Sequence, residues 1–288
     1  MIVAFAGERG AFAELAAREY FGEKATLAPQ QEFGDVFRSV SRGRSSFGVV
    51  PIENSLAGSI HENYDRLLES NLHITGEVLL RIRHFLISNK GTPRREVRRL
   101  FSHPAAFAQC TKFLKRFPHL KVVPVSNTAW AVKKIKSEGL RDAAAIASWQ
   151  AAVDFDMQVL ARNIEDTRWN TTRFLVIAKQ PRLPPPGAGN VKTSIVFSTR
   201  NIPGALYKCM SVFALRDINL HKIESRPVHG RGQGRGFQYL FYLDFAGDAR
   251  GTAQRNAINH LREITTLYRL LGSYPADKPR DPVYRERT

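Results

Sequence analysis

The residues whose side chains are best suited to take part in a reaction lie in NTTRF, Asn170 to Phe174. At this point a polar run gives way to the apolar run LVIAKQ. Two hydroxyls and a guanidinium, those of Thr171, Thr172 and Arg173, therefore stand at the mouth of a predicted buried strand. Polar groups taken out of water without partners cost about 1 to 3 kcal/mol each, and an unpaired charge costs more. The cluster needs either partners within the fold or a ligand. Threonines are also ordinary strand residues, so the local pattern alone leaves both interpretations open.

Other polar groups recur at the predicted strand-to-helix junctions of the first 180 residues. Short apolar runs such as MIVAFA and AAAIAS alternate with helical patterns, which predicts an α/β fold with mostly parallel strands. In open sheets of this kind ligands bind at the carboxyl ends of the strands, so we expect one cleft to collect the junction residues. These are Gly7 to Gly10, Glu53 to Ser55, Ser102 to Pro104, and Asn127 with Thr128.

The chain divides at QPRLPPPGAGN, whose prolines and glycines continue neither a helix nor a central strand. Beyond it the order of predicted elements is β-α-β-β-α-β, which is typical of a ferredoxin-like α+β domain. We therefore expect a first domain at residues 1–180, a linker at 181–191, a second domain at 192–275 and a flexible basic tail at 276–288.

The formal net charge of +17 indicates anionic partners. No zinc-finger spacing, aromatic RNA-recognition pattern or basic zipper accompanies the basic residues, so nucleic acid is not predicted as a partner. The tightest basic group is PRREVRR, with Arg94, Arg95, Arg98 and Arg99. We interpret it as a solvated surface, with a catalytic or phosphate-binding role as the alternative.

The composition also indicates where the protein works. No window reaches the roughly 18 uninterrupted apolar residues of a membrane span, and Glu8 and Arg9 interrupt the start too early for a signal peptide. We expect a cytoplasmic protein with no membrane partner. Cys110 and Cys209 each fall within a helical pattern, which predicts buried free thiols rather than a disulfide or a metal site.

Taken together, the junction motifs resemble those of the prephenate dehydratase family with a C-terminal ACT regulatory domain. The resemblance covers nearly the whole chain in the family's order. The resemblance implies a first domain of two α/β lobes like a type II periplasmic binding protein, followed by the ferredoxin-like ACT domain. It rests on GERGAFAELAA, VPIENSLAGS, SHPAAFAQC, NTAWA, AAAIAS and NTTRF, and on NIPGAL and KIESRP after the linker.

The resemblance implies a carbon–oxygen lyase that converts prephenate to phenylpyruvate in phenylalanine biosynthesis. Loss of carbon dioxide and hydroxide makes the ring aromatic, so the resemblance implies no cofactor and no metal. By resemblance, Thr172 assists the departing hydroxyl. Because threonine is a weak acid, we expect it to act as a preorganised hydrogen-bond donor rather than as a full proton donor.

Substrate-binding residues follow from the same motifs. For Asn54 and Ser55 a helix N-cap is the structural alternative to ligand contact. Arg173 is expected to clamp a carboxylate or to form an ion pair that fixes the strand, and His103 in SHP is more often structural. The predicted set is Gly10, Ala11, Glu53, Asn54, Ser55, His103, Asn127, Thr128, Arg173 and Phe174.

For the second domain the resemblance implies an L-phenylalanine site at an interface between ACT modules, in a homodimer or homotetramer. Binding there would inhibit the enzyme if it changed the cleft. The alternative is that the glycine serves close packing only and that ESRP forms the edge of a β-sheet. The expected effector residues are Pro203, Gly204, Ala205 and Leu206, together with Glu224, Ser225, Arg226 and Pro227.

Several positions depart from the family pattern. Ala11, Ala13 and Ala105 replace hydrogen-bonding side chains, Asn127 replaces an acid and Trp130 replaces a glycine. These changes motivate three alternatives to a prephenate dehydratase. They are an arogenate dehydratase, a prephenate decarboxylase that does not aromatise the ring, and a catalytically impaired phenylalanine-sensing homologue.

Overall fold

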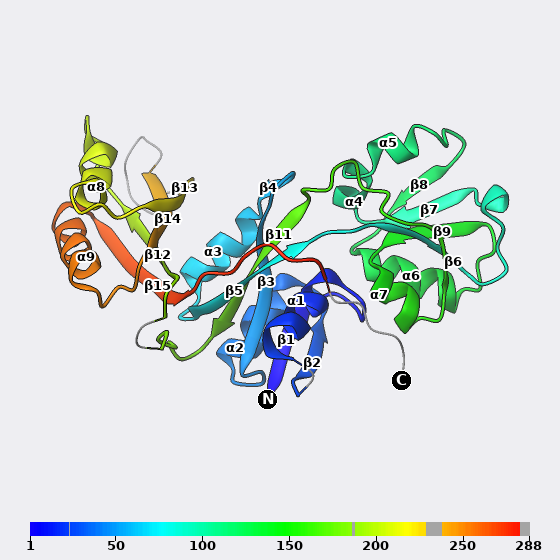
Figure 1. Ribbon diagram of the computed structural model, residues 1–288, viewed down its shortest axis with the longest axis horizontal. Coiled ribbons are helices and arrows are strands. Elements are labelled where there is room, and N and C mark those ends of the chain that lie inside the picture. The colour runs from blue at the N-terminus through cyan, green and yellow to red at the C-terminus, as the bar shows by residue number, and fades with distance from the viewer. Residues whose placement is uncertain (23, 186–187, 229–237, 283–288) are drawn as a thin grey trace. The chain divides into compact units, whose positions relative to one another are not determined.

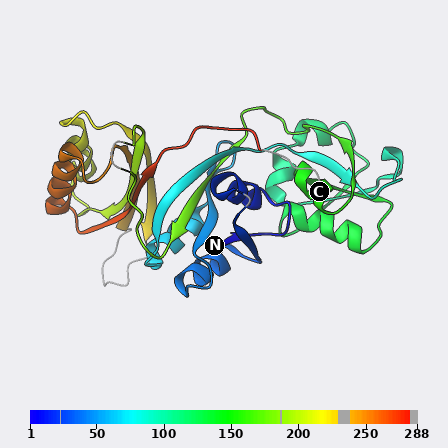
Figure 2. The same ribbon diagram turned by 60° about the horizontal axis from the view of Figure 1, so that its bottom comes forward.

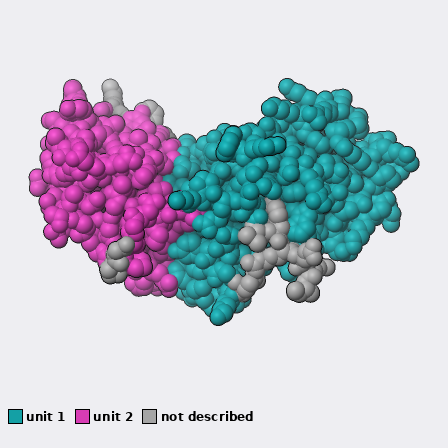
Figure 3. All heavy atoms as spheres, viewed as in Figure 1, with its two compact units in different colours: residues 1–66, 78–176, 278–288 teal, residues 67–77, 177–277 magenta. Residues whose placement is uncertain are grey.

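The computed structural model describes residues 1–22, 24–185, 188–228 and 238–282. The chain forms two compact units (Figure 3). Unit 1 comprises the described parts of residues 1–66, 78–176 and 278–288, and unit 2 comprises those of 67–77 and 177–277.

Most of unit 1 is formed by two α/β lobes, and the first is built on a sheet with the order β2-β1-β3-β11-β5 (Figure 1). Residues 73–77 of β5 and 177–178 of β11 belong to unit 2. Strand β1 pairs in parallel with β2 and with β3, and the short β4 pairs with the end of β3. Helices α1 and α2 pack against β1 and β3. The elements are β1 Ile2–Ala6, α1 Phe12–Phe21, β2 Thr26–Gln30, α2 Phe33–Ser41, β3 Phe47–Asn54, β4 Gly58–Ser59, α3 His61–Glu69, β5 His73–Arg81 and β11 Thr171–Ala178.

The second lobe is built on a sheet with the order β10-β6-β9-β7-β8. Strand β7 is parallel to β8 and β9, whereas β6 is antiparallel to β9 and β10. Every residue of β9 is buried, which explains its unbroken apolar sequence AAAIA. The elements are β6 Phe85–Ser88, the 3-10 helix η1 Arg94–Glu96, β7 Arg99–Ser102, α4 Pro104–Ala108, α5 Thr111–Leu114, β8 Lys121–Pro124, α6 Thr128–Ser137, β9 Ala143–Ala147, α7 Trp149–Asp154 and β10 Gln158–Ala161.

The stretch PAAFAQCTKFLKRF, expected as one helix, forms two short helices, α4 and α5. The carboxylate of Asp166 accepts hydrogen bonds from the backbone N–H groups of Thr111 and Lys112, at 2.9 and 2.8 Å. These bonds satisfy donors that a continuous helix would direct at its own carbonyls. The break therefore depends on a residue that lies 55 positions away from Thr111.

Unit 2 contains a four-stranded sheet with the order β13-β14-β12-β15, in which each neighbouring pair of strands is antiparallel. Helices α8 and α9 lie together on one face of this sheet (Figures 1 and 2). The core between them includes Phe197, Phe213, Phe245 and Leu261. The elements are β12 Val191–Ser198, α8 Ala205–Ala214, β13 Leu220–Val228, β14 Gln238–Ala246, α9 Thr252–Ile264 and β15 Leu267–Pro275.

Residues 67–77 also belong to unit 2. The ammonium group of Lys192 on β12 lies 2.8 Å from a carboxylate oxygen of Glu77, and the Glu77 side chain is completely buried. Arg269 on β15 donates to the carbonyls of Leu68 and Leu72, at 2.8 and 3.0 Å. A buried charge requires such a partner, so these contacts tie the segment to the four-stranded sheet.

The C-terminal segment returns to unit 1 (Figure 2). Arg280 forms a parallel β-bridge with Leu80, and Arg81 and Arg83 form ion pairs with Asp281. Residues 283–288 of the predicted flexible tail lie outside the described residues.

The predicted fold class is confirmed, with two α/β lobes and a separate ferredoxin-like α+β unit. Cys110 and Cys209 are buried free thiols, as expected. Burial raises the pKa of the Cys209 thiol to about 11, and raises that of Cys110 further, so both are poor nucleophiles. Across the described part of the chain, no helix combines the length and the apolar character that crossing a membrane requires.

Candidate active site in unit 1

The side chain of Asn54, at the end of β3, is bonded on both sides of its carboxamide. Its oxygen accepts from the backbone N–H groups of Leu56 and Ala57, each at 2.9 Å. Its nitrogen donates to Asn170 Oδ1 at 2.8 Å and to Thr172 Oγ1 at 3.0 Å. Because the oxygen is used by two N–H donors, the orientation of the carboxamide is fixed.

That orientation determines what the Thr172 hydroxyl can do. Its oxygen accepts from Asn54, and no other described side chain binds it, so its own proton remains available for donation. The residue is 8% exposed, so its hydroxyl lies in surroundings of low dielectric. A hydrogen-bond donor held in this way is ready for an oxygen on which negative charge develops.

Asn54 is one link of a longer chain of hydrogen bonds, which we call the hydrogen-bond chain. Asn170 donates to Gln109 Oε1 at 2.9 Å, and His84 Nε2 lies 2.8 Å from the same oxygen. The hydrogen-bond chain thus links His84 to Thr172 through Gln109, Asn170 and Asn54. All five residues are at most 9% exposed. Because Gln109 Oε1 can only accept, His84 Nε2 carries the proton.

Burial lowers the pKa of His84, although Gln109 and the nearby Glu165 oppose the shift. The imidazole is therefore neutral at neutral pH. Its backbone N–H donates to Glu165 Oε2 at 2.9 Å, and its ring contacts the edge of Phe12 with 5.6 Å between ring centroids. His84 is thus a neutral hydrogen-bond donor at one end of the chain.

Glu53 and Arg173 occupy the opposite faces of β3 and β11 from Asn54 and Thr172, as strand alternation requires. The Arg173 guanidinium lies 3.1 Å from Glu53 Oε1, and its side chain is 7% exposed. An ion pair that fixes the strand was one of the two alternatives expected for Arg173. Its role in carboxylate binding stays a prediction.

The loop after β1 meets the starts of α6 and α7 from the other lobe. Asn127 is the N-cap of α6, and its Oδ1 accepts from the backbone N–H of Trp130 at 2.7 Å. Ser148 is the N-cap of α7, and its hydroxyl donates to the Gly10 carbonyl at 2.6 Å. A Cβ at Gly10 would lie 2.5 Å from the Ala151 backbone, so only glycine permits this approach.

The backbone donors of this loop are already in use. The Gly10 N–H donates to Glu14 Oε2 at 2.6 Å, and the Ala11 N–H donates to the Glu8 carbonyl at 3.0 Å. A substrate carboxylate at either group would have to displace these acceptors. The proposed contacts of Gly10 and Ala11 with substrate remain untested predictions.

The remaining predicted residues are Ser55, His103, Thr128 and Phe174. Ser55 donates to the Trp169 carbonyl at 2.8 Å and accepts from the Thr171 N–H at 2.9 Å. His103 is the N-cap of α4, with Nδ1 accepting from Ala105, and Thr128 is the first residue of α6. Phe174 is buried in β11.

Three residues of the hydrogen-bond chain were not singled out from the sequence. Gln109 and Asn170 stand inside the quoted motifs SHPAAFAQC and NTTRF, and His84 lies outside them. For Gln109 the available signal was a polar side chain within the otherwise apolar segment AAFAQC, which requires an internal partner. Asn170 and His84 stand next to other polar residues, and no such signal marks them. The partners themselves lie up to 118 positions apart, as in the bond between Asn54 and Thr172.

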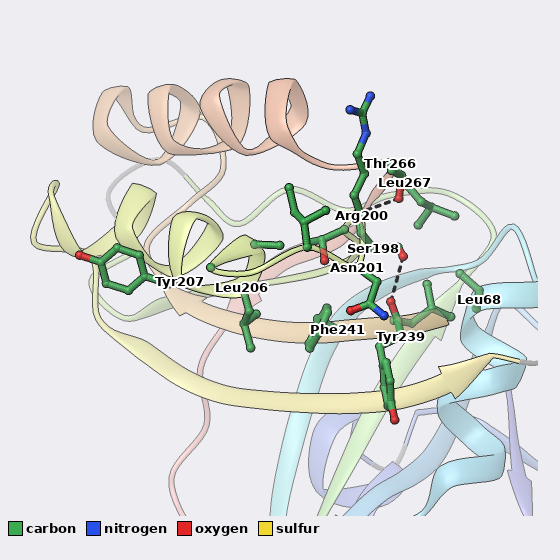
Figure 4. A pocket seen from close by; sticks show the side chains of 15 residues that line it. Leu68, Ser198, Arg200, Asn201, Leu206, Tyr207, Tyr239, Phe241, Thr266 and Leu267 are labelled. Carbon is green, nitrogen blue, oxygen red and sulfur yellow. Dashed lines mark hydrogen bonds between the residues drawn. The ribbon is translucent and has the colours of Figure 1, made fainter. Parts of the chain in front are cut away.

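A second candidate site lies entirely within unit 2. A hollow of about 830 Å³, here called the second-unit hollow, opens beside the start of α8 (Figure 4). Gly204 adopts a left-handed conformation with φ of 74°, which explains the need for glycine before the helix. The hollow is lined by Leu68, Ser198, Thr199, Arg200, Asn201, Ile202, Gly204, Ala205, Leu206, Tyr207, Tyr239, Leu240, Phe241, Thr266 and Leu267.

The structure brings only part of the predicted effector set to this hollow. Gly204, Ala205 and Leu206 line it, whereas Pro203 and residues 224–227 do not. Glu224 to Pro227 lie on the edge strand β13, and Ser225 pairs with Phe241 of the lining. Residues 203–206 thus lie at the start of α8, and residues 224–227 lie on β13 of the same unit.

Comparison with known proteins gives consistent matches over nearly the whole chain. The family model described as Prephenate dehydratase matches residues 3–182. The Arabidopsis thaliana protein named arogenate dehydratase/prephenate dehydratase 2, chloroplastic, is 46% identical over 96% of this chain and 73% of its own length.

Solved structures extend the match to the fold. A prephenate dehydratase from Arthrobacter aurescens, in complex with L-Phe, is 30% identical with a TM-score of 0.87, covering 96% of this chain and 90% of that chain. GqqA, described as a novel type of quorum quenching acylase, is 33% identical with a TM-score of 0.85, covering 96% of this chain and 98% of that chain.

Proposed function

The chain belongs to the prephenate dehydratase family and is a carbon–oxygen lyase, and we propose that its substrate is prephenate and its product phenylpyruvate. The observation that carries the proposal is the Thr172 hydroxyl, which accepts from Asn54 and so retains its own proton for a ligand. We also propose that the protein acts in phenylalanine biosynthesis in the cytoplasm, and that residues 181–191 link its two domains.

The proposed reaction needs little from the protein beyond position and polarity. The carbon–carboxylate bond breaks to release carbon dioxide, its electron pair enters the ring, and the carbon–oxygen bond breaks to release hydroxide, which takes a proton from solvent to become water. Thr172 donates a hydrogen bond to the departing oxygen, and the bond strengthens as negative charge develops there. The hydrogen-bond chain holds this donor in place before the substrate binds, so no reorganisation is required during the reaction.

The rest of the predicted substrate set completes the site in this proposal. Ser55 and Asn127 lie beside the two clusters described above, and Arg173, oriented by Glu53, contributes positive potential to a dianionic ligand.

The acylase name of the 33% identical structure is not favoured by this site. Acyl transfer by a hydroxyl uses a neighbouring base, often histidine. In the described part of the chain, the hydroxyls of Thr172 and Ser148 bond to Asn54, Gly10 and Ala151 rather than to a histidine. A nucleophile and base pair is therefore not assembled among these groups.

Arogenate dehydration is the second candidate because the 46% identical relative carries both names. Arogenate has an ammonium group where prephenate has a ketone. Purified protein incubated separately with the two compounds, with products identified by mass spectrometry, distinguishes them. Phenylpyruvate formed from prephenate above the spontaneous rate supports the proposal, and formation of phenylalanine from arogenate alone would replace it.

For regulation we propose that L-phenylalanine binds at the second-unit hollow in a homodimer or homotetramer. The Arthrobacter aurescens relative was solved with L-Phe, and the lining here offers apolar side chains beside the backbone of Gly204. Residues 224–227 would complete the site from a neighbouring copy. Light scattering with and without L-phenylalanine tests the assembly, and a monomer under both conditions would contradict it.

A further inference from the structure

The arginine group of PRREVRR has no part in the proposed dehydratase reaction, yet it surrounds a hollow of its own. The hollow has a volume of about 630 Å³ and lies on the second lobe of unit 1, and we call it the arginine hollow. Its lining residues are exposed except for the half-buried Phe117. They are Arg94, Arg95, Arg98, Phe117 and His119.

Two of these guanidinium groups are held in place without being neutralised. The guanidinium of Arg94 lies 4.3 Å from the centre of the Phe117 ring and 5.4 Å from that of Phe113. Arg98 Nη1 donates to the Arg95 carbonyl at 2.7 Å. An aromatic face and a carbonyl restrict a side chain while leaving its formal charge uncompensated.

The next arginine in the sequence shows the contrast. Arg99 forms a bidentate ion pair with Asp142, at 2.9 and 2.5 Å, and hydrogen bonding with Arg99 lowers the pKa of that carboxyl group. Within the described residues, Arg94, Arg95 and Arg98 form no ion pair with a carboxylate. Three unneutralised guanidinium groups within five positions repel one another, at a cost that an anion would remove.

The surrounding charges reinforce this field. Between Arg94 and Lys121 the chain carries eight arginine and lysine residues and one acid, Glu96. A neighbouring hollow of about 340 Å³ shares Arg94 and adds Lys112, Arg116 and Arg162 to the lining. Of its two acids, Asp166 accepts three hydrogen bonds at the start of α5, and Glu165 accepts from the backbone of His84.

We propose that the arginine hollow binds a multiply charged phosphate anion of nucleotide size. Arginine forms paired hydrogen bonds with phosphate oxygens, and a volume of about 630 Å³ lies within the usual range for small-molecule sites. Three of the cationic groups line a single hollow of small-molecule size, which favours a small anion over a nucleic-acid strand. The site is independent of the dehydratase reaction.

Titration calorimetry on the full chain at low salt tests the proposal, with inorganic tripolyphosphate, ATP and a 20-nucleotide RNA as probes. We expect each protein chain to bind one tripolyphosphate ion. Binding to the double variant Arg95→Gln/Arg98→Gln should be at least tenfold weaker. The matched control is Arg42→Gln/Arg44→Gln, which removes the same charge beside another hollow, in the first lobe. Its affinity should change less than twofold.

The remaining outcomes are equally decisive. ATP binding as tightly as tripolyphosphate supports recognition of phosphate alone, and tighter ATP binding that is lost in Phe117→Leu supports a further contact with the base. Absence of binding overturns the proposal, as does equal weakening in both double variants. Binding of the 20-nucleotide RNA more tightly than tripolyphosphate, weakened in Arg95→Gln/Arg98→Gln, would assign the surface to nucleic acid instead. Circular dichroism on each variant establishes that the exposed substitutions leave the fold intact.

Discussion

The surroundings of Thr172 and the second-unit hollow are built in different ways. Thr172 is positioned by a continuous chain of buried side chains, each hydrogen-bonded to the next. The second-unit hollow is instead bordered by exposed apolar side chains, including Tyr207 at 76% and Leu206 at 37% (Figure 4). The groups that position Thr172 all belong to a single chain, whereas the second-unit hollow exposes apolar surface.

This difference fits two kinds of task. Holding a donor at a reacting atom requires a geometry that is fixed before the ligand arrives. An effector site gains from being unfinished in one chain, because its affinity then depends on the arrangement of subunits. Substitutions in unit 1 should therefore change turnover, and substitutions in the second-unit hollow should change effector binding.

The largest expected effect is on turnover at Thr172. Replacement by valine keeps the shape and removes the donor, so we expect kcat to fall about 10²- to 10⁴-fold. Thr172→Ser restores the hydroxyl and should remain within about tenfold of the parent. Thr171→Val, on the opposite strand face, is the matched control. Phenylpyruvate absorbance measures the rates, and a parental kcat for Thr172→Val would refute the role.

A sharper test reverses the direction of one hydrogen bond. In Asn54→Asp the carboxylate can still accept from Leu56 and Ala57, but it cannot donate to Thr172. The threonine would then donate to the new carboxylate, and its proton would be lost to the substrate.

We expect kcat of Asn54→Asp to fall on the order of 10²-fold, with L-phenylalanine affinity unchanged. Thermal unfolding should show a folded protein, which separates this loss from misfolding. A variant as active as the parent would show that the orientation of the Thr172 proton does not matter.

Leu206→Ala tests the other side of the comparison. Removing three carbons from a half-exposed lining side chain should weaken L-phenylalanine binding about tenfold, with kcat in the absence of effector unchanged. Calorimetry measures the affinity. Leu215→Ala, an exposed leucine on the same helical segment outside the lining, is the control. Equal affinity in the parent and in Leu206→Ala would place the effector elsewhere.

The smallest effect concerns pH. Because burial lowers the pKa of His84 from 6.5, the unfolded chain binds a proton below that pH before the folded chain does. The free energy of unfolding should therefore decrease as pH falls from 7 to 5. His84→Asn should make this decrease shallower without abolishing it, since desolvation also lowers the pKa values of His73 and His103. Chemical denaturation at several pH values measures the slope. The exposed His221→Gln is the control, and an unchanged slope in His84→Asn would contradict the assignment.

The sequence predicted the parts of the fold that local pattern determines. Periodicity and junction residues identified β1, β3, β9 and the element order of unit 2, and the motif ENS led to Asn54. It did not identify β2, because TLAPQ contains a proline and has weak strand character. That proline is tolerated because β2 is an edge strand, which only the assembled sheet reveals.

The hydrogen-bond chain could not be predicted for a related reason. Its bonds join residues 116 positions apart at Asn54 and Asn170, and 61 apart at Gln109 and Asn170. Sequence pattern shows that a buried amide requires a partner but not which partner the fold supplies. The separation of α4 from α5 by Asp166 has the same origin.

The route of the chain through the two units limits what a single break in the backbone can do. Because residues 67–77 belong to unit 2 and the described residues after 277 belong to unit 1, each unit contains residues from both sides of the predicted linker at 181–191. A protease that cut only this linker would leave Glu77 bonded to Lys192 and Leu80 bridged to Arg280. The two fragments would therefore stay together as a nicked but folded molecule, and separating the two units would require redesigning the chain rather than cutting it.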